Sequence, residues 1–508
     1  MKLVVGIDVG GTNTDAVLVG NGQIIAWAKV PATQDVYSGI VAALARIPDA
    51  SMAARVHIGT TAFTNALVER RELAPVAAIR AGKPVSESLP PMTDWPDDLR
   101  AAVHNRSYFI SGGREYDGRP ISPLDRDEVT RIARELAQTG ITQVALTSVF
   151  GTSYPDDEVR VAEWMAAENP ALQFSLSHRI GRFGILEREN AALLNAMLHP
   201  LAIRTVAAYR SAVPGNLFIS QNDGTVMAGT RAVEAPIFTV ASGPTNSLRG
   251  AAILGASREA IVLDVGGTTT DAGVLHLGYP QAAGLDLTVA GVRTNFRMPD
   301  LISVGIGGGS LVDVESGSVG PKSVGFRLTE RALVFGGDTL TLTDIAVAAG
   351  RINLGDCNRV AQIGHDTIAR VDDHLRKQLG RLLENYDRPG RHLPIVLVGG
   401  GAPLIEHLLR ELGHEVVRPA HSEVANAYGA AMAQVGGEAD LTFSSGAISR
   451  QEALDRAEHE AHRRAVEAGA SRDSITTVEL EDAAFSYLAS DALRVRARAV
   501  GDVEDESR

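Results

Sequence analysis

I-V-L-D-V-G-G-T-T-T-D-A-G-V-L, residues 261 to 275, repeats the pattern of residues 6 to 19, G-I-D-V-G-G-T-N-T-D-A-V-L-V. In both copies an apolar run ends in an aspartate and two glycines, and a hydroxyl-rich segment leads to a second aspartate and another apolar run. Asp8 and Asp15 of the first copy correspond to Asp264 and Asp271 of the second. Two copies half a chain apart predict two related halves.

Each copy has the composition of a β-hairpin that holds an anion at its turn. A β-branched run that enters a Gly-Gly turn and leaves as a second β-rich run predicts a hairpin, and glycines without a Cβ let a ligand approach the backbone. The amides of residues 12 to 14 and of residues 268 to 270 then form a small nest for phosphate. Asp8 and Asp264 would repel bare phosphate, so we expect Mg²⁺ with most of its waters between them and the anion. The simpler interpretation, a tight turn without a ligand, suits a single copy better than two copies with the same carboxylates.

The composition of the 508 residues is that of a globular protein with about two or three domains. Acidic residues outnumber basic ones by 61 to 48, for a formal charge of −13, which argues against nucleic acid or an anionic membrane as a partner. Cys357 is the only cysteine, which excludes an intramolecular disulfide and fits a cytoplasmic protein. We expect neither export nor membrane insertion, because Asp8 interrupts the first apolar run and no later run approaches the ~18 apolar residues of a membrane span.

Residues 1 to 255 are predicted to form the first half of the protein. Residues 55 to 70, R-V-H-I-G-T-T-A-F-T-N-A-L-V-E-R, predict a strand, a Gly-Thr-Thr corner and a helix. Residues 83 to 125 are rich in Pro, Asp and Gly and predict an irregular surface insertion. Strands and helices then alternate, which is typical of a mostly parallel sheet with helical cover. The long helical pattern over residues 184 to 213 is expected to bend or break at Pro200.

Residues 256 to 437 are predicted to form the second half. Its parts are the repeated hairpin, a charged helix over about 358 to 384, and a buried strand that leads through three glycines into a helix at 394 to 412. Small residues at 244 to 255 and 423 to 435 predict helices that pack closely at a hinge between the halves. Residues 438 to 508 are expected to form a small C-terminal appendage.

The order of these parts resembles the superfamily of actin, sugar kinases and heat-shock chaperone ATPases. The resemblance implies an α/β fold of two ribonuclease-H-like halves around a central nucleotide cleft, with ATP and Mg²⁺ as cofactors. It also implies that the two glycine turns contact the phosphates from opposite sides and that Asp8 and Asp264 hold Mg²⁺ through water. The residues 399 to 401 would pack against adenosine. A Walker A motif is absent, and the first glycine turn lacks the following helix that a dinucleotide-binding Rossmann motif requires.

A closer resemblance is to the hydantoinase/oxoprolinase family, the A subunits of ATP-dependent hydantoin-cleaving enzymes. It covers the chain to about residue 436. The phosphate motifs define only the superfamily, whereas G-T-T-x-x-T-N-A-L at 59 to 67 and G-I-G-G-G-S at 305 to 310 are specific to the family. The resemblance implies a small cyclic amide or carbonyl compound as substrate, a second hydantoinase-type subunit as partner, and an oligomer.

These observations give two sets of candidate site residues. The catalytic candidates are Asp8, Asp264, Asp271 and Asp15, with Asp8 and Asp264 also the metal ligands. The cofactor-binding candidates are Gly10, Gly11, Thr12, Asn13, Gly266, Gly267, Thr268, Thr269, Gly307, Gly308, Gly309, Gly399, Gly400 and Gly401.

The favoured function is the ATP-dependent hydrolysis of a cyclic amide. Transfer of the γ-phosphoryl group to the ring carbonyl oxygen would make the carbon a better electrophile and the oxygen a better leaving group, and such transfer needs mainly positioning and charge neutralisation. Asp271 or Asp15 would orient or deprotonate a nucleophile, or one of them would only brace its turn. Two alternatives are a small-molecule kinase, which leaves a stable organic phosphate, and a nucleotide-gated regulatory or chaperone-like protein.

Overall fold

The N-terminal hairpin lies in the largest sheet of the protein, called the first sheet below. The computed structural model describes residues 2–31, 36–103, 106–284, 287–386, 392–444, 448–484 and 492–504. In spatial order the first sheet contains β22 (Thr476–Ala484), β23 (Ala492–Gly501), β21 (Val435–Ser444), β10 (Val226–Ala228), β9 (Asn216–Ser220), β4 (Arg55–Thr60), β1 (Leu3–Val9), β2 (Asn13–Gly20) and β3 (Gln23–Pro31). Strands β1, β4 and β9 are parallel, so their carboxyl ends meet at one edge.

The repeated hairpin lies in a second sheet of similar design. Its strands are β13 (Tyr279–Pro280), β12 (Thr270–His276), β11 (Ala260–Val265), β19 (Ile395–Val398) and β20 (Val416–Val417), and β16 (Leu301–Val304) pairs with β12. Strand β11 pairs antiparallel with β12 and parallel with β19, as β1 pairs with β2 and β4. The two halves therefore share one core topology, as the sequence repeat predicts.

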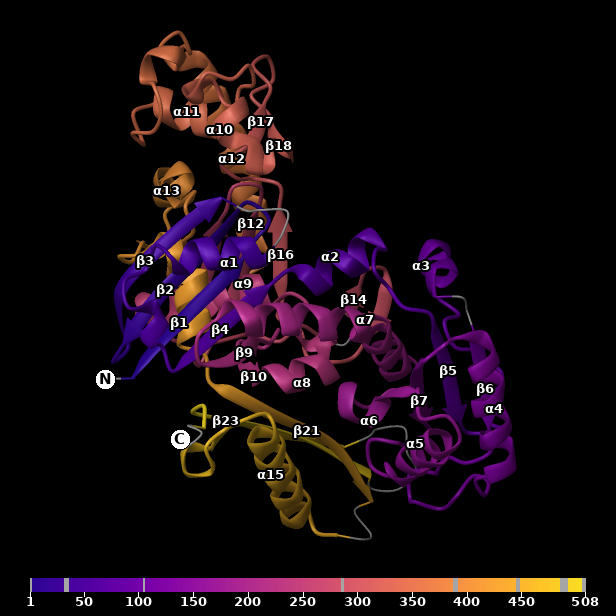
Figure 1. Ribbon diagram of the computed structural model, residues 1–508. Helices are drawn as coiled ribbons and strands as arrows, with labels where there is room; N and C mark the ends of the chain where they lie inside the picture. Colours follow the sequence, from indigo (N-terminus) through magenta and orange to yellow (C-terminus); the bar gives the residue numbers. More distant parts are fainter. Residues whose placement is uncertain are drawn as a thin grey trace.

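A third sheet extends the first half at the right of Figure 1. It contains β6 (Arg106–Ile110), β5 (Val76–Ala81), β7 (Gln143–Ser148) and β8 (Gln173–Leu176), all parallel. The helices of this region are α3 (Asp97–Ala102), α4 (Arg126–Thr139), α5 (Asp156–Glu168) and α6 (Ser177–Ile180). The expectation of an irregular insertion over 83 to 125 is wrong where α3 and β6 lie. Strand β6 is at the sheet edge and half exposed, so its residues lack the apolar pattern of a buried strand.

Two helices of small residues connect the halves. Helix α9 (Ser242–Leu254) packs along α14 (Ala425–Ala431), and α14 also lies on β1 and β2. The backbones touch: a Cβ on Gly250 would lie 1.8 Å from the carbonyl oxygen of Ala425, and a Cβ on Gly429 would lie 1.9 Å from that of Asn246. Only glycine fits at these two positions, which explains the small-residue pattern.

The longest helix, α7 (Ile185–Ala212), runs between the first and third sheets (Figure 1). Of the expected bend or break at Pro200, the break is wrong, because α7 continues through this residue. Its neighbours Leu198, Leu201 and Ala202 are buried in the core, and this packing offsets the missing backbone hydrogen bond. By length and composition α7 could also cross a membrane, contrary to the expectation from the sequence, but 61% of its most apolar window is buried inside the protein, as in a core helix.

The remaining helices cover the sheets or project from them. They are α1 (Val36–Leu44), α2 (Ala62–Glu69), α8 (Gly229–Glu234), α10 (Leu328–Arg331), α11 (Leu342–Ala348), α12 (His365–Glu384), α13 (Ala402–Glu411) and α15 (Arg450–Glu467). Two small hairpins pair β14 (Leu287–Val289) with β15 (Val292–Thr294) and β17 (Ser310–Val312) with β18 (Val319–Ser323). The charged helix begins at His365 rather than near 358, because Gly364 separates it from a short 3-10 turn at Cys357–Val360.

Residues 438 to 508, expected to be a small appendage, are joined to the first half by a shared sheet. Val435 at the start of β21 pairs with Val226 of β10, so β21, β22 and β23 continue the first sheet. Helix α15 packs on β21 and β23 through its buried alanines (Figure 1). This arrangement places residues of the C-terminal region beside the first half and the third sheet.

Candidate active site

The two repeated hairpins have the same geometry at their turns. In the first, the Gly10 amide donates to the Asn13 carbonyl at 3.0 Å, and in the second the Gly266 amide donates to the Thr269 carbonyl at 2.8 Å. Asp8 lies opposite Asp15 across the first hairpin, and Asp264 lies opposite Asp271 across the second. Each glycine turn is therefore flanked by one aspartate on each of its two strands.

The turns come from different sheets and meet. A Cβ on Gly267 would lie 3.4 Å from the side chain of Thr12. A Cβ on Gly11 would have no neighbour within 4 Å, so the backbone of the first turn is open to a ligand. Two glycine turns that face each other can hold a single polyphosphate chain from both sides.

The first hairpin carries two buried carboxylates. Asp8 is 8% exposed and Asp15 is 4% exposed. Burial, together with the charges of Asp15 and Asp264, raises the pKa of Asp8 to about 7, although a hydrogen bond from Asn426 opposes this rise. The mutual effect of their charges shows that the two hairpins bring Asp8, Asp15 and Asp264 together, as the sequence suggests.

The second hairpin carries carboxylates of a similar kind. Burial raises the pKa of Asp264 to about 6, with the charges of Asp271 and Asp15 acting in the same direction and a hydrogen bond from Ser247 acting against them. Burial also raises the pKa of Asp271, and a hydrogen bond from Ser303 lowers it in part. Burial is therefore the largest cause of the raised pKa at both carboxyls of the second hairpin.

Sequence reasoning missed the polar groups that hold the first hairpin. The Asn426 side-chain amide donates to Asp8 Oδ2 and to Asp15 Oδ2, both at 3.0 Å. Lys29 Nζ donates to Asp15 Oδ2 at 2.7 Å. Lys29 could have been found from the sequence, because a third strand paired with the hairpin places this residue opposite Asp15. Asn426 gave no such signal, because it lies 418 residues from Asp8 in the chain.

Residues 307 to 309 lie against the second turn rather than at its open side. The Gly308 amide donates to the Gly266 carbonyl at 3.1 Å, and the Gly309 amide donates to the Gly267 carbonyl at 2.7 Å. A Cβ on Gly307 would lie 2.6 Å from the backbone nitrogen of Thr268. The glycines therefore fix the shape of the turn, and Thr343 supports them through a 2.8 Å hydrogen bond to the Gly308 carbonyl.

The residues 399 to 401 follow β19, beside the second hairpin. Gly399 has a φ of +87°, and a Cβ there would lie 2.3 Å from Asp264 Oδ1. The Gly401 amide donates to the Val265 carbonyl at 2.8 Å, whereas a Cβ on Gly400 would have no neighbour within 4 Å. In the first half Gly59 of β4 has the corresponding role, because a Cβ there would lie 2.6 Å from Asp8 Oδ1.

Two ribonuclease-H-like halves around a central cleft, with a glycine hairpin from each half, define the actin-like ATPase class of fold. A solved structure of the ATP-dependent caprolactamase from Pseudomonas jessenii matches 99% of this chain and 88% of its own with a TM-score of 0.75 and 19% identity. A nucleotide-free structure of acetone carboxylase matches 100% of this chain and 89% of its own with a TM-score of 0.66 and 19% identity. At this identity the likeness shows the fold.

The chain belongs to the hydantoinase/oxoprolinase family. The model of the hydantoinase/oxoprolinase N-terminal region matches residues 4–168, and the model of hydantoinase/oxoprolinase matches residues 188–364. The family resemblance of the motifs is thereby confirmed.

Curated relatives are similar over most of this chain. The γ subunit of acetophenone carboxylase from Aromatoleum aromaticum is 27% identical over 68% of this chain and 53% of its own length. The α subunit of caprolactamase from Pseudomonas jessenii is 26% identical over 68% of this chain and 54% of its own length. The 5-oxoprolinase of Saccharomyces cerevisiae is 26% identical over 52% of this chain and 21% of its own length. The chain thus spans about half the length of the first two relatives.

Proposed function

We propose that the protein uses ATP to phosphorylate the carbonyl oxygen of a cyclic amide and so prepares the ring for hydrolysis. The observation that carries this proposal is the meeting of two glycine turns with their paired carboxylates. Such a site suits phosphoryl transfer, which depends on positioning and on neutralising charge around the phosphates. The similarity to a caprolactamase subunit and to 5-oxoprolinase supports a cyclic amide as the acceptor.

Asp8 and Asp264 are the residues that would hold Mg²⁺. Burial raises the pKa of both carboxyls, and neighbouring carboxylates add to the rise: Asp15 acts on both, and Asp264 also acts on Asp8. A divalent cation would relieve this repulsion. Bound there, Mg²⁺ would neutralise charge on the phosphates. Mg²⁺ usually keeps several waters and uses one or two carboxylates, so it needs no dense ligand cluster. In the described part of the chain no group of three His, Cys, Asp or Glu side chains forms such a cluster.

The other two aspartates would have different tasks. Asp15 is held by Lys29 and Asn426, so it fixes the first hairpin. The pKa of Asp271 is raised, and among the described residues no cation is paired with it, so it is the better proton acceptor. As the carbonyl oxygen on the ring forms its bond to the γ-phosphorus, the bond between the γ-phosphorus and the β,γ-bridging oxygen of ATP breaks, and Asp271 would take the proton from the ring nitrogen. The products of this step are ADP and an imidate phosphate.

Closure of the two halves about α9 and α14 would exclude water from this step. Water would then attack the activated carbon, the carbon–nitrogen bond would break, and phosphate would leave on hydrolysis of the resulting acyl phosphate. We further propose that a second subunit completes the reaction, because similar chains are named as subunits of larger enzymes.

A ketone is the second candidate for the carbonyl substrate. The similarity to the γ subunit of acetophenone carboxylase favours it. Both candidates share phosphorylation of a carbonyl oxygen. They differ in the proton that is lost, which comes from the ring nitrogen of the amide or from the carbon beside the ketone carbonyl, and in the next step, because an imidate phosphate is attacked by water whereas an enol phosphate reacts as a nucleophile through that neighbouring carbon.

The test is Mg²⁺-dependent ATP hydrolysis by the purified protein with hydantoins, lactams, 5-oxoproline and simple ketones, with Asp8→Ala as the blank. Stimulation by a ring compound, lost in Asp8→Ala, supports the proposal and identifies the ring class. Accumulation of a stable organic phosphate instead indicates a small-molecule kinase. ATP binding with no stimulation by any compound contradicts the proposal for this chain by itself, and repetition with the second subunit then decides between a missing subunit and a regulatory protein.

A further inference from the structure

A cavity of about 840 Å³ lies between the first half, the third sheet and the C-terminal region. Its walls include α6, the segment that follows β9, strand β21 and helix α15. None of the described residues that line it belongs to the hairpin turns or to the glycine segments at 307 to 309 and 399 to 401. The cavity therefore lies apart from the proposed site of phosphoryl transfer, and its volume is in the range of sites that bind small organic molecules.

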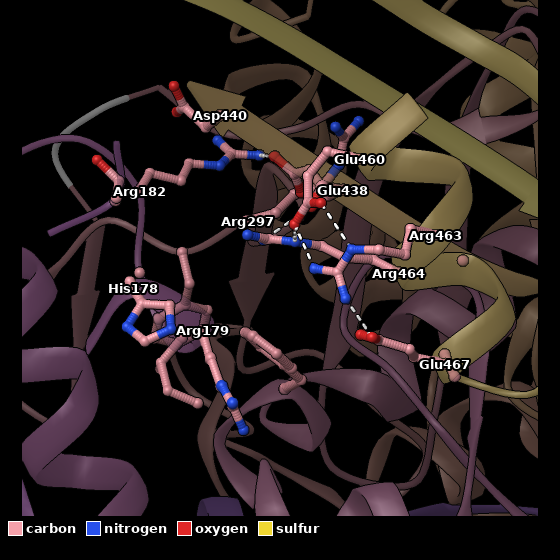
Figure 2. Close-up of a pocket in the computed structure, with 18 of the residues that line it drawn as sticks. His178, Arg179, Arg182, Arg297, Glu438, Asp440, Glu460, Arg463, Arg464 and Glu467 are labelled. Atoms are coloured by element: carbon pink, nitrogen blue, oxygen red, sulfur yellow. Dashed lines mark hydrogen bonds and ion pairs between the residues drawn. The ribbon is translucent and has the colours of Figure 1, made fainter. Parts of the chain in front are cut away.

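The carboxylates in the wall of the cavity are all paired with arginines. In Figure 2, Arg463 bonds Glu460 and Glu467, and all three lie on α15. Arg182, which follows α6, pairs across the cavity with Glu438 of β21. Each of the six carboxylates among the described lining residues has at least one such ion pair: Asp223, Glu234, Glu438, Asp440, Glu460 and Glu467. These acids thus have no need of a cationic ligand.

Arginines outnumber the carboxylates in this wall. The arginines among the described lining residues are Arg179, Arg182, Arg231, Arg297, Arg456, Arg463 and Arg464. Two of the acids, Asp223 and Asp440, are paired with Arg498 and Arg494, which lie outside the wall. Arg179 has no ion pair or hydrogen bond with the described residues, and Figure 2 shows its guanidinium apart from the paired cluster. The wall therefore keeps a positive charge that is available to a ligand.

Two further polar groups of the wall have hydrogen-bonding capacity to spare. Thr152 follows β7 and is 8% exposed, and its Oγ1 has no hydrogen-bond partner in the described part of the chain. The imidazole of His178, on α6, has its Nδ1 2.8 Å from Glu158 Oε2. Since a carboxylate only accepts, Nδ1 carries the proton and Nε2 is left for a ligand. The two groups are neighbours, because a Cβ on Gly151, just before Thr152, would lie 2.5 Å from the other oxygen of Glu158.

Glu158 is a fixed anion that orients His178. Burial alone would raise the pKa of Glu158, but the hydrogen bond and charge of His178, with Arg188 and Ser177, hold that pKa below its ordinary value. Ser177 Oγ donates to Glu158 Oε1 at 2.6 Å, and the Ser148 amide donates to the same oxygen at 2.9 Å. These bonds hold the carboxylate in one position, so Nε2 of His178 is fixed before a ligand arrives.

The chemistry of these groups defines the kind of ligand. Arg179 and Thr152 are donors, which suit the oxygens of a carboxylate or a phosphate. A neutral imidazole with its proton on Nδ1 accepts a hydrogen bond at Nε2, and the paired carboxylates keep unused lone pairs, so the same wall also suits hydroxyl groups. Apolar side chains such as Phe238 and Leu441 line the cavity as well and would face C–H groups. A ligand with an anionic group on a hydroxylated carbon skeleton meets all of these requirements.

We propose that this cavity is a second ligand site, separate from the site of phosphoryl transfer, and that it binds a small polyhydroxylated anion, either a sugar phosphate or a sugar acid. Arg179 and Thr152 bind the anionic group, and His178 accepts a hydrogen bond from a neighbouring hydroxyl. Because the walls belong to α6 on one side and to β21 and α15 on the other, the bound ligand joins the C-terminal region to the third sheet. This site does not depend on the ATP-dependent reaction proposed above.

The test is calorimetric titration of the protein, without ATP, with glucose 6-phosphate, gluconate, glucose and inorganic phosphate. We expect one of the two organic anions to bind at least about 10-fold more tightly than glucose, the scale of one charged hydrogen-bond pair, and also more tightly than inorganic phosphate. Tighter binding of glucose 6-phosphate assigns the site to sugar phosphates, and tighter binding of gluconate assigns it to sugar acids. Arg179→Ala should remove most of the preference over glucose, and Thr152→Val should weaken anion binding about 3-fold.

Two control variants separate this site from other causes of a changed affinity. Arg131→Ala removes an exposed arginine of α4 away from the cavity and should bind like the wild type. Asp8→Ala should also keep the anion binding, because Asp8 does not line the cavity. Arg179 is exposed and unpaired, so Arg179→Ala should leave the melting temperature unchanged.

Three results would overturn the proposal. The first is an affinity for both organic anions no higher than that for glucose. The second is a preference that Arg179→Ala retains or that Asp8→Ala loses, since the anion would then bind elsewhere or at the hairpin turns. The third is inorganic phosphate that binds as tightly as the organic anions, because the hydroxylated skeleton would then contribute nothing. Arg179-dependent binding of an organic anion supports the site even if no compound stimulates ATP hydrolysis.

Discussion

The two hairpins of this protein have the same backbone and different surroundings. In both, a glycine amide closes the turn, and a neighbouring glycine leaves room for the first aspartate. The second aspartate differs: Asp15 is bonded by Lys29 and Asn426, whereas burial raises the pKa of Asp271 with only a partial offset from Ser303. The two copies therefore share the backbone that we propose to hold phosphate, and they differ in the surroundings of the second carboxylate.

The largest expected effect comes from exchanging the second aspartates one at a time. Asp271→Asn should lower kcat about 100-fold or more, the scale of a lost general base, with little change in ATP affinity. Asp15→Asn should act mainly on stability and ATP affinity, because it leaves Lys29 without its partner. Steady-state kinetics and thermal unfolding of both variants check this. A loss of kcat in Asp15→Asn as large as in Asp271→Asn, at unchanged stability, would show that the hairpins do not differ in this way.

A smaller effect is expected where the backbone of the second half approaches Asp264. Gly399→Ala would place a Cβ 2.3 Å from Asp264 Oδ1 at a φ of +87°, so the free energy of unfolding should fall by about 3 kcal/mol through left-handed strain and overlap. Gly400→Ala is the matched control, because its Cβ would meet nothing within 4 Å. Chemical denaturation measures both. Equal stability of the two variants would mean that Gly399 is not needed to admit Asp264.

The pH dependence of stability tests the charge of the first hairpin. The pKa of Asp8 is raised to about 7, so the folded state binds more protons than the unfolded state between about pH 4 and pH 7, and stability should fall as pH rises through this window. The loss expected from Asp8 between pH 5 and pH 8 is about 2.5 kcal/mol, and Asp8→Asn should remove this part. The exposed Asp94→Asn is the control. A wild-type protein that gains stability over this range would contradict the raised pKa.

Local patterns predicted much of this fold. The hairpins, the strand and glycine turn before α13 and the small-residue helices are each decided by short stretches, and the repeat gave the pairing of Asp8 with Asp15 and of Asp264 with Asp271. Contacts between distant segments were not predictable in this way. Asn426 reaches Asp8 across 418 residues, and Val435 joins β10 through a single strand pairing that leaves no pattern in the sequence.

The residues of the candidate site differ in the same way: some are predicted by short stretches of sequence and others are not. The carboxylates and glycines of the turns were predicted, because each copy displays them within fifteen residues. The cavity beside Arg179 was not, since its walls come from β9, α6, β21 and α15, and only the packing of these elements brings their side chains together.

The most direct measurement is a double-mutant cycle on Mg²⁺-dependent ATP binding with Asp8→Ala, Asp264→Ala and the double variant. If both hairpins hold one Mg²⁺–ATP complex, each single variant should lose most of the Mg²⁺-dependent affinity, and the double variant should be little worse than either. Strictly additive losses, or an Asp264→Ala variant that binds like the wild type, would show that the two turns do not form one site.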